Sequence, residues 1–445
     1  MAGFLDSLRS GDWLTLSRAR LWAMAVLVAS AGGLAYLVAT SDGLIDYQGR
    51  PLGTDFSNVY TAGRMALEGR AADAFDPRLE HGREKEIFGE NTPFYGWHYP
   101  PFFLGVAAAL ALMPYQLALI VWQGVTLVLY LLAIRAIVSP LIPPPQGEGG
   151  ARSAPGGAFA TQSSSPPDRR FAAATLPASR GGIWLLLALA YPAVFVNLGH
   201  GHNGFLSAAL MGLALVTLDT RPILSGILFG LLAYKPQFGL MIPLVLLATG
   251  RGRTLFAAGA TIAALVVAAT LAFGMEAWRA FAVFAEYTRT IVLETGETGW
   301  HKIQSVFSWA RMWGAPVSLA YAIQSAVTLL VAATVIWLWR SRASFALKAA
   351  ALYLGAMLAT PYSLDYDLMM LAPAIAFLTV DGIERGFSPY EKTALAFLWI
   401  VPLIARGVAQ VTFIPLGVLA MLLTFALVLH RAGLFAARTN PIPAR

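Results

Sequence analysis

Long, uninterrupted runs of apolar residues constrain the fold of this chain more than any other feature. A helix that crosses a bilayer needs roughly 20 consecutive apolar residues. Twelve runs reach or approach that length, and none alternates apolar and polar residues as the strands of a membrane β-barrel do. The sequence therefore predicts an all-α, polytopic membrane protein with about twelve transmembrane helices, at 19–40, 115–138, 182–198, 203–219, 221–235, 236–250, 254–274, 316–339, 345–361, 362–380, 393–407 and 410–430.

The charged residues agree with a membrane protein and exclude several other classes. They make up 12% of the 445 residues, whereas soluble proteins average roughly a quarter. The net charge of +7 comes from basic residues between the apolar runs, where they orient helices and do not indicate nucleic-acid binding. The chain has no cysteine, which excludes disulfides, thiol nucleophiles and cysteine-ligated metals. Arg18 and Arg20 precede a run too long for a signal peptide, so we expect an uncleaved first helix.

The segment 99–113 decides the predicted topology. It is apolar but short, and the prolines at its ends, Pro100 and Pro114, favour a helix that does not cross the membrane. If it crossed, the basic loop 139–181 would lie outside together with Asp55, against the tendency of basic loops to stay in the cytoplasm. We therefore expect both termini inside and one membrane domain over 1–445, with an outer loop at 41–114 that contains juxtamembrane helices, a flexible low-complexity cytoplasmic loop at 139–181 and a second outer loop at 275–315.

This topology brings polar segments from five parts of the chain to the outer surface of the membrane. Ionisable groups at membrane depth are costly, so they indicate a functional cavity by default. The five segments are the loop 41–114 with Asp55, the turn 197–204, the turn 234–237, the loop 275–315 and the segment 362–367.

Several of these residues also have plain structural interpretations. Asp55 could cap a helix predicted from residue 57 to 69. The charged run 68–90 is interpreted as a solvated amphipathic helix and not as a site. His200 and His202 lie two residues apart on a glycine-containing turn without a partner motif, which supports zinc only weakly. They could instead donate hydrogen bonds to a phosphate or a sugar.

The remaining ionisable residues leave alternatives open in the same way. Lys235, beside Pro236, could extend its ammonium group to the membrane surface or bind a phosphate. Asp365 and Asp367 come close on a helical turn, and one of them could pair with Lys235 or Arg406. The chain has no phosphate-binding Walker A sequence, so any activated donor must arrive through the lipid phase or from outside.

Six motifs carry a resemblance to a known family: Asp55-Phe56, Tyr60-x-Ala62-Gly63-x-x-x-Leu67-x-Gly69, Tyr99-Pro100-Pro101, Gly201-His202-Asn203, Lys235-Pro236 and Gln304-Ser305. At these positions the chain resembles glycosyltransferase family 87, whose members are integral-membrane enzymes of the GT-C type and include mannosyltransferases that depend on polyprenyl-phosphate mannose. The resemblance covers residues from about 50 to 380. The chain departs from the family at His202, where the family commonly has glutamine.

The resemblance implies a GT-C fold and a mannosyl transfer, with inversion, from a polyprenyl-phosphate donor to a lipid or glycan acceptor. The reaction would take place at the outer face of the inner (cytoplasmic) membrane, with Asp55 as the general base. The donor phosphate needs cationic partners, for which Lys235, His301, Lys302 and Arg64 are the candidates. No cofactor is expected, and a divalent metal, although possible, is not favoured. The predicted substrate-binding residues are Tyr60, Arg64, His98, Tyr99, His200, His202, Asn203, Lys235, Gln237, His301, Lys302, Gln304, Asp365 and Asp367.

Two other functions fit a chain of this class. A transporter or lipid flippase also has many spans with both ends inside, but it should show inverted repeats and broken helices at the bilayer centre. The sequence has no convincing internal repeat, and its polar residues gather at one face. A noncatalytic scaffold of an envelope-assembly complex would use the long outer loops as docking surfaces.

Overall fold

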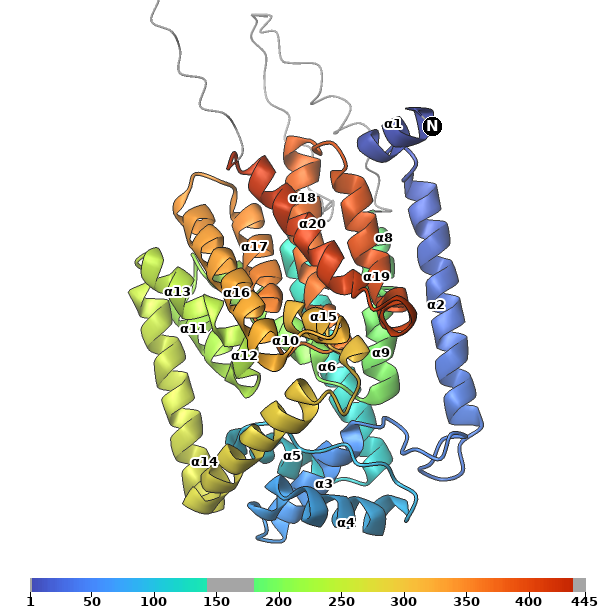
Figure 1. Cartoon of the computed structure of the whole chain (residues 1–445), viewed down its shortest axis with the longest axis vertical. Coiled ribbons are helices and arrows are strands. Elements are labelled where there is room, and N and C mark those ends of the chain that lie inside the picture. The colour runs from blue at the N-terminus through green and yellow to red at the C-terminus, as the bar shows by residue number, and fades with distance from the viewer. Residues whose placement is uncertain (1, 142–179, 435–445) are drawn as a thin grey trace, which may run out of the picture.

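The regular secondary structure of the described residues is entirely helical, which confirms the predicted all-α class. The structure is a computed structural model and describes residues 2–141 and 180–434, so nearly all of the predicted loop 139–181 lies outside the described residues. Within these ranges the only β pairing consists of isolated bridges, such as the one between Ile303 and Leu364. The longer helices run roughly side by side along the molecule, and a separate group of short helices packs at one end (Figure 1).

The longest apolar helices agree closely with the sequence. They are α2 (Leu16–Ala39), α6 (Tyr115–Val138), α14 (Gly252–Tyr287), α16 (Val317–Arg340), α18 (Leu371–Arg385, preceded by the turn η7, Asp365–Met370) and α19 (Glu391–Thr412). Among the described residues, six helices are long and apolar enough to cross a membrane, and a bent pair provides a seventh span. That pair is α8 (Arg180–Leu189) with α9 (Pro192–His200), which meet at 51°. The protein is therefore a multi-pass membrane protein.

The predicted count of twelve transmembrane helices is not confirmed, because five of the apolar runs form shorter helical stretches. For example, α10 has 14 residues and would be ~21 Å long, less than the ~30 Å of a hydrocarbon core. Pro236 separates two such stretches, since proline disrupts a helix interior. The shorter helices are α10 (Gly204–Thr217), α11 (Pro222–Leu231) with η4 (Leu232–Tyr234), α12 (Pro236–Gly239) with α13 (Met241–Ala248), α17 (Phe345–Leu358) and α20 (Leu416–Arg431).

The helix α2 shows how the apolar surface is used. It stands at one side of the molecule and runs from the end that carries α1 (Ala2–Ser10) to the opposite end (Figure 1). Ala23 is its only buried residue, while large side chains such as Leu21, Trp22 and Val28 are exposed. An exposed apolar surface of this extent marks a contact with membrane or protein, and on a helix of membrane-spanning length we assign it to lipid.

At the end opposite α1, short helices form a compact group that we call the α3–α5 module (residues 41–114, Figure 1). A Cβ atom on Gly63 would lie 2.1 Å from the carbonyl oxygen of Ala107, so only glycine allows α3 and α5 to pack this closely. The segment between Pro100 and Pro114 forms one short helix, as predicted from its prolines. The elements of the module are α3 (Phe56–Leu67), η1 (Asp73–Phe75), α4 (Pro77–Phe88), η2 (Pro101–Phe103) and α5 (Leu104–Ala111).

The region 275–315, predicted to be an outer loop, is largely helical. The helix α14 breaks at Gly274, whose φ of 76° lies in the left-handed region, and then continues to Tyr287. Beyond the break it packs on the α3–α5 module, where the rings of Phe75 and Phe281 lie 5.7 Å apart. The chain then forms a π-helical stretch η5 (Thr288–Glu294), η6 (Trp300–Lys302) and α15 (Val306–Met312).

Candidate active site

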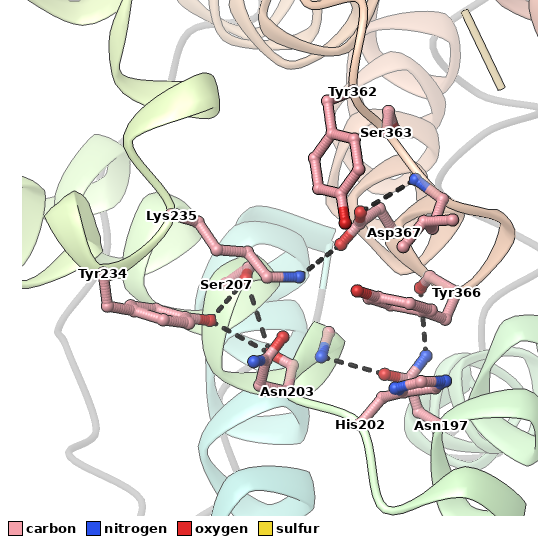
Figure 2. A network of polar contacts seen from close by, with 12 residues as sticks. Asn197, His202, Asn203, Ser207, Tyr234, Lys235, Tyr362, Ser363, Tyr366 and Asp367 are labelled. Carbon is pink, nitrogen blue, oxygen red and sulfur yellow. Dashed lines mark hydrogen bonds and ion pairs between the residues drawn. The ribbon is translucent and has the colours of Figure 1, made fainter. Parts of the chain in front are cut away.

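Segments from all five predicted regions meet where α3 begins. The turn between α9 and α10 lies between Asp55 and η7, and η7 in turn contacts the start of α12 and the segment after η6. Figure 2 shows the part of this network around Lys235 and Asp367. The contacts that join the segments are Asp55 with His202, His202 with Tyr366, Lys235 with Asp367, and Ile303 with Leu364.

Asp55 occupies the position before α3 but does not cap it. Its carboxylate makes no hydrogen bond to the backbone of the helix. Instead, Oδ2 lies 3.1 Å from Nε2 of His202. This contact depends on Gly201, where a Cβ atom would lie 2.5 Å from the Cβ of Phe56, so that glycine alone lets the turn approach α3. Asp55 therefore does not cap α3, and its carboxylate faces the 197–204 turn.

The electrostatic environment of Asp55 keeps its carboxyl group near half-protonation at neutral pH. Burial is the main cause that raises the pKa of Asp55, to about 7, and the Asp365 carboxylate adds to it. Lys302, Arg406 and Lys235, in that order, lower the pKa of Asp55 but do not outweigh these two causes. The side chain still keeps 33% of its surface exposed, so it can be reached. A carboxylate with a pKa near the working pH suits proton transfer.

The two histidines of the 197–204 turn have different partners. Burial lowers the pKa of His202 well below its usual value, so its imidazole is neutral, and its Nε2 lies 3.1 Å from Oδ2 of Asp55. The His202 ring also stacks on Tyr366 with the ring centres 3.7 Å apart. His200 lies with Nδ1 2.6 Å from the hydroxyl of Thr54. Each histidine is therefore oriented by a neighbour on another segment.

The same three side chains could hold a metal ion. The ligand atoms of Asp55, His200 and His202 all lie within 4.8 Å of one another. Two imidazoles and a carboxylate are suitable ligands for zinc and similar transition metals. Among residues 2–141 and 180–434, this is the one such group of three or more histidines or acids.

A buried ion pair forms the interior side of the site (Figure 2). Nζ of Lys235 lies 2.5 Å from Oδ1 of Asp367, and the side chains are 3% and 1% exposed. The second carboxylate oxygen of Asp367 accepts a hydrogen bond from the backbone of Leu364 at 3.0 Å. The ammonium group also lies 4.7 Å above the ring of Tyr366. Lys235 therefore pairs with Asp367, one of the two aspartates proposed for it, and is not free to bind a phosphate while this pair persists.

Polar side chains hold the 197–204 turn in place (Figure 2). Nδ2 of Asn197 donates to the carbonyl of Tyr366 at 3.1 Å, and its Oδ1 accepts from the backbone of Gly204 at 2.8 Å. The hydroxyl of Tyr234 donates to the carbonyl of Asn203 at 3.1 Å. Asn203 itself is buried, and its side-chain oxygen has no hydrogen-bond partner among the described residues. This oxygen is therefore not engaged by the described part of the protein, and the contact of Asn203 with substrate stays a prediction.

Around Asp55, the less buried cations come from two other segments. Arg406 of α19 lies with its guanidinium 3.7 Å from Asp365 and is 47% exposed. Burial and the charge of Arg406 lower the pKa of the half-buried Lys302 and of His301. From the sequence we expect Arg406 only as a partner for an aspartate, although an arginine within an apolar run is itself a signal of function. Arg406 and Lys302 are the cations of a group that also contains His301, and we call this group the cationic rim.

Two other predicted residues lie close to this network. Tyr99 lies with its ring 6.2 Å from that of Tyr234, and burial, followed by the charge of Asp55, raises the pKa of Tyr99. Gln304 is fully buried, and its backbone donates to the carbonyl of Ser363 at 2.6 Å. Gln304 therefore links the segment after η6 to the segment before η7, and its buried side-chain oxygen has no hydrogen-bond partner among the described residues.

Four predicted substrate-binding residues have other surroundings. Arg64 follows Asp55 by nine residues, or ~13 Å along a helix, and its side chain is 43% exposed beside Glu68. The hydroxyl of Tyr60 donates to a backbone carbonyl of the α3–α5 module. His98 lies 3.0 Å from the hydroxyl of Thr288. No hydrogen bond to the Gln237 side chain occurs within the described part of the chain.

The interpretation of 68–90 as a solvated helix is wrong for one face of α4. Glu80 and Glu84 are both fully buried, one helical turn apart. Glu84 accepts a hydrogen bond from Ser57 at 2.9 Å, and Glu80 accepts one from the backbone of Trp97 at 3.0 Å. Burial raises the pKa of both carboxyl groups. Glu84 therefore connects α4 to the start of α3, two residues after Asp55, and Glu80 connects α4 to the segment around Trp97.

Comparison with known proteins supports an enzymatic role. A model of glycosyltransferase family 87 matches residues 97–361, more than half of the chain. No curated protein and no solved structure matches it. The matched range includes the 197–204 turn and Lys235 and ends just before η7, while Asp55 precedes it. The chain belongs to glycosyltransferase family 87 and is a multi-pass membrane glycosyltransferase.

Proposed function

We propose that this enzyme transfers mannose from a polyprenyl-phosphate donor to a lipid or glycan acceptor at the outer face of the cytoplasmic membrane. The observation that carries the proposal is the position of Asp55, accessible and with a pKa of about 7, beside a group of cations at one end of a membrane helix bundle. A reaction on a lipid-linked sugar needs a proton acceptor next to a site for a phosphate leaving group.

The proposed step is a single displacement. The Asp55 carboxylate accepts the proton of an acceptor hydroxyl as that oxygen forms a bond to the anomeric carbon of the sugar. The bond between this carbon and the donor phosphate breaks, and the phosphate leaves with the bonding electrons. Attack and departure on opposite faces invert the anomeric carbon. His202, whose Nε2 lies 3.1 Å from Oδ2 of Asp55, limits the directions that the carboxylate can take.

The cationic rim supports the phosphate-binding part of this proposal. Lys302 and Arg406 lie near Asp55, since both lower its pKa. A guanidinium forms charge-assisted, often bidentate hydrogen bonds to phosphate oxygens. Lys302 is thus a phosphate partner that the sequence also predicts, and Arg406 takes the place of Arg64 and Lys235 in this role. Should a divalent ion bind Asp55, His200 and His202, it would supply further positive charge to the leaving phosphate.

The direct test is transfer by purified protein. Polyprenyl-phosphate mannose labelled in the sugar, mixed with extracted envelope lipids, should give a labelled lipid or glycan and free polyprenyl phosphate. Donors that carry other hexoses or pentoses serve as comparisons. Transfer of a different sugar would correct the donor, and failure with every lipid-linked donor would refute the proposal.

Replacing Arg406 with alanine should lower kcat/KM for sugar transfer. A hydrogen bond to a charged group contributes about 1.5–3 kcal/mol, which corresponds to a loss of roughly ten- to hundredfold. Arg64→Ala is the matched control, because Arg64 is also a partly exposed arginine beside an acid but lies at the far end of α3. The assignment is wrong if the two variants lose activity to the same degree.

A plot of log kcat/KM against pH should bend near pH 7. A general base acts when deprotonated, so kcat/KM should rise with pH, about tenfold per unit below the pKa of Asp55, and level off above it. Because Arg406 lowers the pKa of Asp55, this bend should lie at higher pH in the Arg406→Ala variant. A stopped assay from pH 5 to 8 measures kcat/KM over this range. A value of kcat/KM that does not change with pH contradicts the role of Asp55 as general base.

A further inference from the structure

A polar hollow lies at the end of the molecule that carries α1, opposite the α3–α5 module (Figure 1). Its volume is about 570 Å³. It is formed where α17 begins and where α18 and α20 end. The charged and polar residues that line it include Arg342, Ser344, Asp381, Arg385 and Arg431. None of these residues belongs to the site around Asp55.

The arginines of the hollow differ in how far their charge is already neutralised. Arg431 is 11% exposed and bridges Asp381 and Glu391 at 2.6 and 2.5 Å. Arg385 lies 3.3 Å from the same Asp381 but is 62% exposed. Arg342 is exposed and forms no ion pair within the described ranges. Two guanidinium groups therefore have donors available for a further anion.

An apolar groove adjoins this hollow, because Phe387 lines both. The groove has a volume of about 760 Å³ and runs between the start of α2 and the helices α8, α18 and α19. Its lining is almost entirely apolar, and its one charged residue is Lys392, whose ammonium lies 5.5 Å above the Phe387 ring. The indole nitrogen of Trp184, in the same lining, is buried and has no hydrogen-bond partner in the described structure. The groove thus combines apolar walls with cationic and donor groups.

We propose that an anionic phospholipid binds here, with its phosphate on Arg342 and Arg385 and its acyl chains in the groove. Basic pockets next to apolar surfaces between transmembrane helices bind anionic lipid head groups. Around the shared Phe387, four cations (Arg342, Arg385, Lys392 and Arg431) face two carboxylates (Asp381 and Glu391), so the local charge favours an anion. Acyl chains fill the groove because burial of apolar surface is favourable. This lipid site is separate from the proposed sugar transfer and does not depend on it.

The test is binding of phosphatidylglycerol and phosphatidylcholine to the purified, delipidated protein, measured by native mass spectrometry and by the thermal shift that each lipid causes. Phosphatidylglycerol should bind and raise Tm, while phosphatidylcholine should bind at least about tenfold more weakly, since it lacks net charge. The double variant R342Q/R385Q should lose this preference. Arg253→Gln, which changes an exposed arginine at the start of α14, is the matched control and should keep it.

A second variant separates the groove from the charged hollow. Ala396→Trp places a large side chain in the lining of the groove and should weaken phosphatidylglycerol binding, whereas Ala326→Trp, on the exposed face of α16, should not. Equal binding of both lipids, or an unchanged preference in R342Q/R385Q, would overturn the proposal. Displacement of phosphatidylglycerol by polyprenyl phosphate would overturn it as well and would assign the groove to the donor tail. Because no sugar transfer is measured, a failure here leaves the enzymatic proposal untouched.

Discussion

Replacing Asp55 with asparagine should reduce kcat for sugar transfer by about a thousandfold, the middle of the range that a general base contributes. Asparagine keeps the size of the side chain and can still meet His202, but it cannot accept a proton. The loss should therefore appear in kcat, with the protein folded and the donor still bound. Single-turnover transfer from a labelled donor, together with donor binding by the same variant, measures both quantities.

The control for this experiment is Asp73→Asn in the same α3–α5 module. Asp73 is partly exposed, pairs with Arg70 at 2.9 Å and lies outside the site, so its replacement should leave kcat within about twofold. Full activity of the Asp55→Asn variant would show that Asp55 is not the general base. Loss of donor binding in step with kcat would instead give Asp55 a role in binding.

Breaking the pair between Lys235 and Asp367 should have the largest effect on stability. Removing one partner leaves an uncompensated buried charge, which typically costs about 3–5 kcal/mol. We expect both Lys235→Met and Asp367→Leu to lower the free energy of unfolding by this amount. Because each side chain is at most 3% exposed, water cannot replace the lost partner. Unfolding in mixed detergent, followed by tryptophan fluorescence, gives the midpoint and slope.

The double variant K235M/D367L distinguishes a buried charge from general loss of packing. With both charges gone, the protein should lose less stability than the sum of the two single changes, and no more than the larger of them. The exposed pair of Arg251 and Asp219, at 2.6 Å, is the reference, and its removal should cost less than about 1 kcal/mol. Additive losses in the double variant would mean that the two residues act independently.

The sequence predicts the long helices well and the short ones poorly. The run 115–138 matches α6 to the residue, and 316–339 matches α16 within one residue, since long apolar runs admit few other structures. Hydropathy cannot tell a span from a shorter apolar helix buried in the bundle, as the runs 221–235 and 236–250 illustrate. The helix after Gly274 was not predicted, because the apolar run 254–274 is already long enough to cross a membrane and charged residues such as Glu276 and Arg279 follow it.

The candidate site was predictable in its segments but not in its pairings. The two aspartates at 365 and 367 and their two possible cations were evident, and the structure pairs each aspartate with one cation. The burial of each cation decides which one remains accessible, and burial at a single position cannot be derived from the sequence. The buried face of α4 had a weak signal, since Glu80, Glu84 and Phe88 recur every four residues on one side of the helix. The sequence nevertheless favours a solvated helix there, because a helix face that carries acidic residues is usually exposed to water.

The break at Gly274 divides α14 into two helical parts that belong to different regions of the enzyme. The first part is apolar and exposes large side chains such as Leu271, as expected of a helix in contact with lipid, and the second part reaches His98, whose ring lies 5.2 Å from Phe284, next to Tyr99 of the site. A bilayer that is too thick or too thin tilts an embedded helix, and any such tilt must be absorbed at a single glycine or transmitted to Tyr99. Reconstitution into lipids of different chain length should therefore change turnover, so that membrane thickness itself acts as a control on the rate of glycosylation.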